Sequence, residues 1–230
     1  MSQHDGHDHD GQSAPEFWDD FYRSGTAQWS GNPNPLVVQE AEHLAPGTAL
    51  DLGCGQGDDA IWLALRGWTV TGVDVADAAL ERAAERAEAA GVDTIVWQQH
   101  DLAETFPAAN YDLIIAAYLH SPVELPRSEI LGRAAAAVSP GGTLLIVGHA
   151  GFPAGSGHDH MQLPTTDEVM ADLQLDLTTP MWRIDTKTVV TWTAERDDKP
   201  MTRDDNILRL TRLAESAQSN PSEMPSVRVL

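Results

Sequence analysis

A glycine-rich turn with a carboxylate before it is the part of the sequence with the clearest chemical meaning. Gly53, Gly55 and Gly57 follow a short apolar run, and Asp51 precedes them. Glycines let a ligand approach the backbone closely, and the amides that open a helix are unpaired. A dinucleotide site needs the spacing G-x-G-x-x-G, but Asp58 holds the position of the third glycine. The turn therefore favours a cationic ligand over a pyrophosphate.

Further carboxylates end the next two strands along the chain. Asp74 ends the second strand and is placed to accept hydrogen bonds from both hydroxyls of a ribose. Asp101 ends the third and can accept a hydrogen bond from an exocyclic amine such as that of adenine. Because the carboxyl ends of parallel strands open on one crevice, these side chains are expected to converge with Asp51. The ligand predicted from them carries a ribose, an amino-bearing base and a positive charge, and no phosphate.

Alternating strands and helices are expected to hold these residues in place. This alternation is typical of an α/β fold with a doubly wound parallel sheet. Two further strands after a helix predict an antiparallel order at one end, so we expect a Rossmann-like, seven-stranded, mostly parallel sheet with an antiparallel strand near one edge. The expected strands are 48–52, 69–73, 94–98, 112–117, 143–148, 181–194 and 206–212, and the expected helices are 15–23, 36–44, 58–66, 76–90, 129–138 and 165–173.

Composition limits the classes of partner. The chain has 14 Lys and Arg against 35 Asp and Glu, a formal net charge of -21, so its surface repels nucleic-acid phosphates and anionic membranes. Hydrophobic residues make up 42% of its 230 residues, enough for a full core. No export signal opens the sequence, its apolar runs are too short to cross a bilayer, and the single cysteine suits a reducing compartment. We expect a cytoplasmic protein that binds neither nucleic acid nor membrane; its oligomeric state stays open.

The order of motifs resembles that of the class I S-adenosylmethionine-dependent methyltransferases over residues 45–148. The matching motifs are Asp51-Leu52-Gly53-Cys54-Gly55-Gln56-Gly57, Val73-Asp74, Asp101-Leu102, Tyr111-Asp112-Leu113-Ile114 and Pro140-Gly141-Gly142. Upstream, Phe17-Trp18-Asp19 and the segment 29–35 resemble small-molecule members with an N-terminal lid, of the tellurite-resistance and thiopurine-methyltransferase kind. The resemblance implies a helical lid (15–44) and a methyltransferase domain (45–216). Composition predicts a disordered His- and Asp-rich tail (1–14), which has no apolar anchor, and a C-terminal tail (217–230).

The same resemblance implies that the cofactor is S-adenosylmethionine and the product S-adenosylhomocysteine. The three glycines would line its methionine and ribose portions. Asp51 would lie near its amino group, and Asp74 would hold the ribose. The other cofactor contacts that it implies are Val75 on the adenine ring, Asp101 and the Leu102 amide at the adenine edge, Ala117 at the methionine end, Cys54 in the turn, and Trp29 closing over the cofactor.

The implied reaction is methyl transfer to a small-molecule acceptor. Because a sulfonium methyl is already activated, the protein mainly has to align the groups and exclude water. A general base is needed only where the acceptor must lose a proton, and His120, just after the fourth strand, is the predicted base. Cys54 lacks the surroundings of an acyl-transfer nucleophile. No metal is predicted at the site.

Two alternatives remain open at this point. A nicotinamide-dependent oxidoreductase uses a similar sheet, but the glycine spacing and Asp58 disfavour it. A protein on the same fold that only binds the cofactor, or that handles metals through the His-rich loop at 149–163, would have no transferase activity. The sequence does not identify the acceptor.

Overall fold

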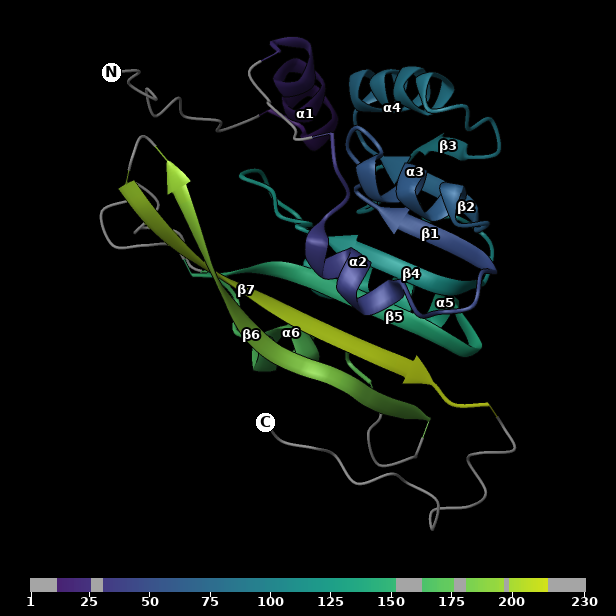
Figure 1. Cartoon of the computed structure of the whole chain (residues 1–230), viewed down its shortest axis with the longest axis vertical. Coiled ribbons are helices and arrows are strands. Elements are labelled where there is room, and N and C mark those ends of the chain that lie inside the picture. The colour runs from purple at the N-terminus through teal and green to yellow at the C-terminus, as the bar shows by residue number, and fades with distance from the viewer. Residues whose placement is uncertain (1–11, 26–30, 152–162, 176–180, 197–198, 215–230) are drawn as a thin grey trace.

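One seven-stranded sheet runs through the protein in the order β3-β2-β1-β4-β5-β7-β6 (Figure 1). The structure is a computed structural model that describes residues 12–25, 31–151, 163–175, 181–196 and 199–214. The strands are β1 (Thr48–Leu52), β2 (Thr69–Asp74), β3 (Val96–Gln99), β4 (Tyr111–Ala117), β5 (Val138–Gly151), β6 (Trp182–Arg196) and β7 (Lys199–Arg212).

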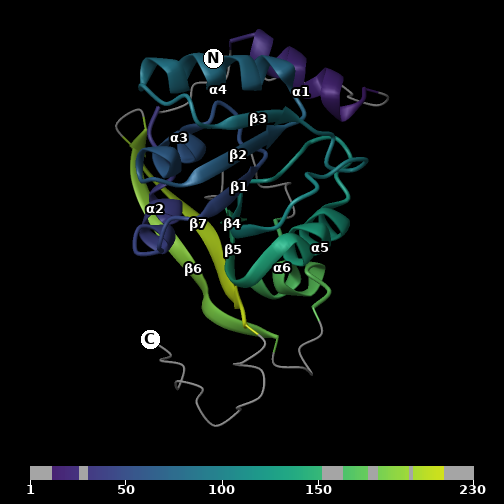
Figure 2. The same cartoon turned by 90° about the vertical axis from the view of Figure 1, so that its right-hand side faces the viewer.

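Helices cover both faces of this sheet (Figure 2). On one face, Leu36 and Val37 of α2 and Leu63 of α3 pack against side chains of the strands. On the other face, Ile130 of α5 and Val169 of α6 pack against the strand side chains that point the opposite way. Burial on both faces explains why the central strands are apolar almost throughout. The helices are α1 (Ala14–Arg23), α2 (Pro35–Ala41), α3 (Asp58–Leu65), α4 (Asp77–Ala89), α5 (Arg127–Ala137) and α6 (Thr166–Asp172).

Strand directions confirm the predicted fold class. β1 to β5 run parallel to one another, whereas β7 lies antiparallel between β5 and β6. The sheet is therefore mostly parallel, with one antiparallel strand near an edge. The carboxyl ends of β1, β2, β3 and β4 open on the same side, as the site prediction requires.

The last two strands are longer than their sequence pattern predicts. Residues 195–205 have the composition of a polar turn, yet β7 begins at Lys199 and pairs with β6 as far as Arg196↔Lys199. Residues 199–203 of β7 pair with β6 but not with β5, so this part of the hairpin extends past the rest of the sheet. Residues 195–205 contain few apolar side chains. They therefore lack the alternation of apolar and polar residues by which a half-buried strand is recognised in a sequence. The prediction was wrong at this boundary, and the missed half-strand reaches the site.

Two helices precede the first strand and differ in what they contact. α1 lies beside α4, where Asp19 accepts a hydrogen bond from the Ala78 amide at 2.9 Å. Trp18 Nε1 donates to Ser121 Oγ, in the loop after β4, at 3.2 Å. α2 instead packs into the core of the sheet. α1 is thus placed over the strand ends, and α2 reaches them only with its first residue and its N-cap. Within the described ranges, no helix has the length and apolar character that a bilayer crossing needs.

Candidate active site

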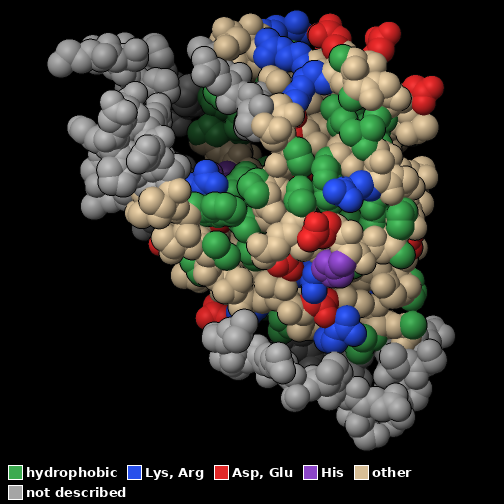
Figure 3. Space-filling view, viewed as in Figure 1, with side chains coloured by type: hydrophobic (Ala, Val, Ile, Leu, Met, Phe, Trp, Pro, Cys, Tyr) green, Lys and Arg blue, Asp and Glu red, His purple; other side chains and the backbone are tan. Residues whose placement is uncertain are grey.

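A cavity of about 430 Å³ lies at the carboxyl ends of the parallel strands. Its size suits a cofactor or a drug-sized ligand. Figure 3 shows a hollowed surface with hydrophobic side chains on its walls. The predicted site residues that line the cavity are Asp51, Gly53, Cys54, Gly55, Asp74, Val75, Asp101, Leu102, Ala117 and His120.

Two predicted cofactor contacts are not placed at this cavity. Trp29 lies outside the described residues. Gly57 precedes α3 as its N-cap with φ +79°, and it does not belong to the lining of the cavity. A β-carbon there would lie 2.7 Å from the Trp97 ring, so this glycine is required by packing and by its left-handed backbone.

Asp74 ties the glycine turn to the end of β2. Its side chain is buried, and its two carboxylate oxygens accept hydrogen bonds from the Gly55 amide at 2.9 Å and the Ala76 amide at 3.0 Å. Burial raises the pKa of Asp74, while these amides oppose the rise. The Val75 amide is a third backbone donor to this carboxylate. The two oxygens accept about four hydrogen bonds in all, so one acceptor position remains, which a ribose hydroxyl matches.

Asp51 makes the crevice unusually acidic. Its side chain is only 3% exposed, and burial raises its pKa well above the ordinary value, with further increases from Asp59 and Asp74. Burial also raises the pKa of Asp59 to about 6, although the Asn34 amide donates to its Oδ1 at 2.6 Å. Crowded carboxylates in a buried place are stabilised by a cation. The crevice therefore favours a positively charged group beside Asp51.

Asp101 and Cys54 complete this acidic side of the cavity. Asp101 Oδ1 accepts a hydrogen bond from the Ala103 amide at 3.0 Å, which fixes the carboxylate after β3. Burial raises the pKa of the Cys54 thiol well above its ordinary value, and Asp51 and Asp74 raise it further. The thiol is thus neutral at physiological pH, and a neutral thiol is a poor nucleophile.

The opposite wall of the cavity comes from other parts of the chain. Trp18 on α1, together with Leu119 and Leu125 after β4, supplies apolar surface. Tyr118 directly follows β4 with φ +52°, a backbone conformation that side chains other than glycine seldom adopt. This strained residue turns the chain sharply at the mouth of the cavity.

A buried carboxylate that the sequence analysis missed organises this wall. Asp205 on β7 is fully buried and accepts hydrogen bonds from the Tyr118 hydroxyl at 2.8 Å, from His149 Nδ1 at 2.9 Å and from Arg203 Nη2 at 2.8 Å. Burial alone would raise the pKa of Asp205, but the bonds from His149, Tyr118 and Arg203 outweigh it and lower that pKa. Arg203 itself lines the cavity. No sequence signal pointed to either residue, because both lie in the half-strand predicted to be a turn.

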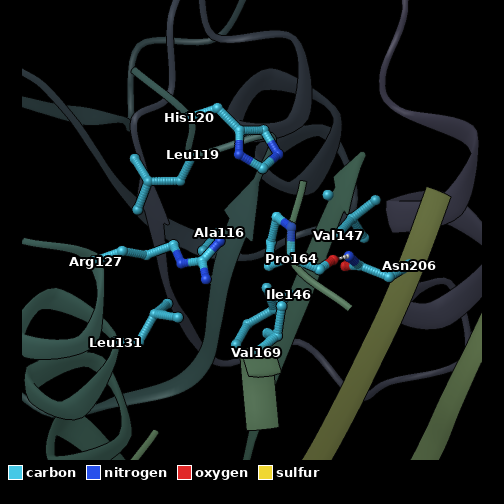
Figure 4. Close-up of a pocket in the computed structure, with 11 residues that line it drawn as sticks. Ala116, Leu119, His120, Arg127, Leu131, Ile146, Val147, Pro164, Val169 and Asn206 are labelled. Atoms are coloured by element: carbon cyan, nitrogen blue, oxygen red, sulfur yellow. Dashed lines mark hydrogen bonds between the residues drawn. The ribbon is translucent and has the colours of Figure 1, made fainter. Parts of the chain in front are cut away.

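His120 lies in the predicted place but is not set up as a base. Its Nε2 accepts a hydrogen bond from the His149 amide at 3.2 Å, so in the neutral ring the proton is on Nδ1. Burial lowers the pKa of His120 to about 4, with further lowering by His149 and Arg127. The ring also borders a second cavity of about 20 Å³, with room for one water molecule (Figure 4). The general-base role of His120 stays a prediction, and it requires the lone pair of Nε2 to leave the His149 amide.

Comparison with known proteins agrees with this description of the sheet and its cavity. Residues 49–142 match the family model of a methyltransferase domain. The chain is 37% identical over 101 residues to 27-O-demethylrifamycin SV methyltransferase of Amycolatopsis mediterranei, covering 42% of this chain and 36% of that protein. It is 34% identical over 137 residues to 2-heptyl-1-hydroxyquinolin-4(1H)-one methyltransferase of Mycobacteroides abscessus, covering 54% of this chain and 58% of that protein. It thus spans less than two thirds of either relative.

Solved structures extend the likeness to most of the described fold. TehB from Haemophilus influenzae superposes with a TM-score of 0.62 at 20% identity, covering 85% of this chain and 66% of that one. The N-methyltransferase NodS from Bradyrhizobium japonicum, in complex with S-adenosyl-L-homocysteine, superposes with a TM-score of 0.62 at 19% identity, covering 84% and 97%. At such identities these structures bear on the fold alone. Together with the family model, they confirm the predicted fold class and the resemblance stated from the motifs.

Proposed function

The chain belongs to the class I S-adenosylmethionine-dependent methyltransferases, and on that premise we propose that it transfers the methyl group of S-adenosylmethionine to a small-molecule acceptor. The product of the cofactor would be S-adenosylhomocysteine. The cofactor supplies a sulfonium methyl that is activated for in-line displacement. Everything else in the reaction falls to the residues of the cavity.

The acidic wall fits this cofactor. Asp74 retains acceptor capacity for the ribose, and the crowded Asp51 favours the cationic amino group of the methionine portion. Val75 and Leu102 line the same side for the adenine ring, and Asp101 lies there for its amino group. A cavity of about 430 Å³ has space for the cofactor with a compact acceptor.

The opposite wall would align the acceptor and keep water out. Trp18, Leu119 and Leu125 present apolar surface there, and the bond from Trp18 to Ser121 holds α1 against the loop after β4. Alignment of two reactants and exclusion of water supply much of the rate of such a displacement. We therefore assign residues 15–44 as a lid segment, of which α1 does the covering, and residues 45–216 as the methyltransferase domain.

A small-molecule acceptor is supported by the names of the relatives and by charge. One relative is named for a demethylrifamycin and another for a hydroxyquinolone, both small molecules. The net charge of -21 disfavours a nucleic-acid acceptor. The single cysteine, neutral and half-buried in the turn, is consistent with a cytoplasmic location.

The observation that carries the proposal is Asp74, a buried strand-end carboxylate that backbone amides fix beside the glycine turn and that retains acceptor capacity. The test is transfer of isotope-labelled methyl from S-adenosylmethionine to a panel of small hydroxylated, amino and thiol compounds, with S-adenosylhomocysteine measured as the second product. We expect label in at least one acceptor and equimolar S-adenosylhomocysteine. Binding of S-adenosylmethionine without transfer across the whole panel would favour the cofactor-binding alternative.

A further inference from the structure

The wall opposite the carboxylates has the donors of a site for an anion. We propose that the methyl acceptor is a small molecule with an apolar body and an acidic hydroxyl, and that it binds as its oxyanion to Arg203 and Asn34. This inference rests on the proposed methyl transfer and adds the chemical class of the acceptor.

Arg203 presents a fixed guanidinium to the cavity. Its Nε and Nη2 donate to Asp205 at 3.1 Å and 2.8 Å, and Nη2 also donates to the Tyr118 hydroxyl at 3.0 Å. Its Nη1 makes no hydrogen bond within the part of the chain that the structure describes, and the side chain is 37% exposed. A guanidinium held on one side in this way is preorganised to donate on its other side.

Asn34 brings a second donor to the same wall. Its Oδ1 accepts the Leu36 amide at 2.9 Å, which fixes the side chain at the start of α2. Its Nδ2 is buried and makes no hydrogen bond to any described residue, although the amide lies close enough to Tyr118 to lower the pKa of that phenol. A buried donor without an acceptor is costly, so a ligand oxygen there would be stabilised.

Tyr118 links these two donors in space. Arg203 donates a hydrogen bond to the Tyr118 hydroxyl, and the side-chain amide of Asn34 lowers the pKa of the same hydroxyl. Both donors also line the cavity, and Arg203 is the only Lys or Arg among the described lining residues. The other charged residues of that lining are aspartates, of which Asp59 lies behind Asn34 and the rest lie on the cofactor side. Asp205 balances the charge of Arg203, so an anion is held there by the donors Nη1 of Arg203 and Nδ2 of Asn34, whereas the aspartates disfavour it across the cavity.

Among the residues that the structure describes, the groups on this wall offer an acceptor no well-placed base. The Tyr118 hydroxyl donates to Asp205, and Asp205 already accepts from three residues. His120 Nε2 accepts the His149 amide. Asp59, behind Asn34, accepts the Asn34 backbone amide, and its pKa of about 6 makes it a weak base towards a hydroxyl that is not already ionised. An acceptor that needs deprotonation within the site is poorly served by this arrangement, whereas one that ionises in solvent needs no base.

The chemical step then balances without proton transfer to the protein. The hydroxyl loses its proton to water before binding. A lone pair of the oxyanion forms the new bond to the methyl carbon while the bond from carbon to sulfur breaks. The negative oxygen becomes a neutral methyl ether, and the positive sulfonium becomes a neutral thioether. Arg203 and Asn34 would hold the oxyanion until its charge is lost.

A pair of matched probes tests this binding without turnover. The protein is first saturated with S-adenosylhomocysteine, and 4-nitrophenol or the similarly shaped 4-nitroaniline is titrated into that complex. Absorbance distinguishes the phenolate from the phenol, so it reports the ionisation state of the bound probe. We expect the phenolate to bind about tenfold more tightly than the aniline, and the pKa of the bound phenol to fall.

Arginine variants test whether Arg203 causes the preference for the phenolate over the aniline. Arg203→Gln should weaken phenolate binding about tenfold and leave aniline binding unchanged, whereas Arg203→Lys should retain part of the preference. Arg183→Gln removes an exposed arginine of β6 that pairs with Asp185 and should behave as the parent protein. Melting curves establish that each variant is folded; if Arg203→Gln is not, the loss of preference is judged on Arg203→Lys.

Three results would overturn the inference: no phenolate bound to the complex, equal affinity for the two probes, or an unchanged preference in the Arg203 variants. Calorimetric binding of S-adenosylhomocysteine separates these from a failure of the proposed function. If it does not bind, the methyltransferase proposal fails. If it binds and the phenolate has no preference, only the acceptor class fails.

Discussion

The two walls of the cavity are built from different parts of the chain. The acidic wall comes from the ends of β1, β2 and β3, within one continuous stretch of the sequence. The facing wall joins α1, the loop after β4 and the first half of β7. The bond from Tyr118 to Asp205 spans 87 positions of the chain, whereas that from Gly55 to Asp74 spans 19. The cofactor side is local in sequence, and the acceptor side is assembled by tertiary contacts.

Because the two walls are held in different ways, mutations in them are expected to have different effects. On the acidic wall, backbone amides hold the carboxylates, so a substitution should act mainly on cofactor affinity. On the facing wall, side chains from distant elements hold one another through Asp205. A substitution there should act on stability and on the acceptor.

The largest effect is expected at Asp205. Asp205→Asn leaves Arg203 and His149 without their carboxylate and should lower the free energy of unfolding by about 3 kcal/mol at pH 7. Because folding lowers the pKa of Asp205 from 3.8, its contribution is present above that value and is lost as the pH falls through the folded pKa. Urea unfolding at pH 7 and pH 3 measures both. Asp204→Asn, the neighbouring change, should cost less than about 1 kcal/mol, and equal losses in the two variants would refute the role of Asp205.

Asp74 provides the matching test on the acidic wall. Asp74→Asn should weaken binding of S-adenosylmethionine about tenfold or more, because a charged acceptor of ribose hydroxyls is lost. The exposed Asp77→Asn, three residues along, is the matched control and should bind as the parent protein. Calorimetric dissociation constants measure both; an Asp74→Asn protein that is folded and binds normally would remove Asp74 from the cofactor site.

A smaller signal should accompany cofactor binding itself. Folding raises the pKa of Asp59 to about 6 and that of Asp51 well above 3.8, so both hold protons in the weakly acidic range. A cation bound beside them should lower these pKa values and release up to about one proton at pH 6. Calorimetry in buffers of different ionisation enthalpy counts that proton. Asp59→Asn should reduce the count; an unchanged count would mean that Asp59 does not sense the cofactor.

The smallest effect is expected at His120. Glutamine can also accept the His149 amide, so His120→Gln should change turnover by less than about threefold. General-base catalysis contributes about a hundredfold or more, so a loss of that size together with a lost limb of the pH–rate profile would restore His120 as the base. Steady-state rates from pH 5 to pH 9 distinguish the two outcomes.

What could be predicted follows the same division. Strand periodicity and the glycine turn placed Asp51, Asp74 and Asp101 on one crevice, because the ends of parallel strands must open together. Helix starts and strand ends in this region were predicted to within about three residues. The packing role of Gly57 could not be predicted, since Trp97 approaches it from β3.

The residues of the facing wall could be identified only from the three-dimensional structure. The polar first half of β7 lacks apolar alternation, so Arg203 and Asp205 had the composition of a turn. The hydrogen bond to His120 comes from the backbone of β5, and no spacing pattern encodes it. The position of His120 in the sequence therefore suggested a base, whereas in the structure its Nε2 accepts a hydrogen bond from the His149 amide.

The most direct test of the account is calorimetric titration of the full chain with S-adenosylmethionine, S-adenosylhomocysteine and NADH. The carboxylates at the strand ends predict one site that binds the first two and shows no binding of the dinucleotide. Failure of both sulfur ligands to bind at millimolar concentration, or saturable binding of NADH alone, would contradict it.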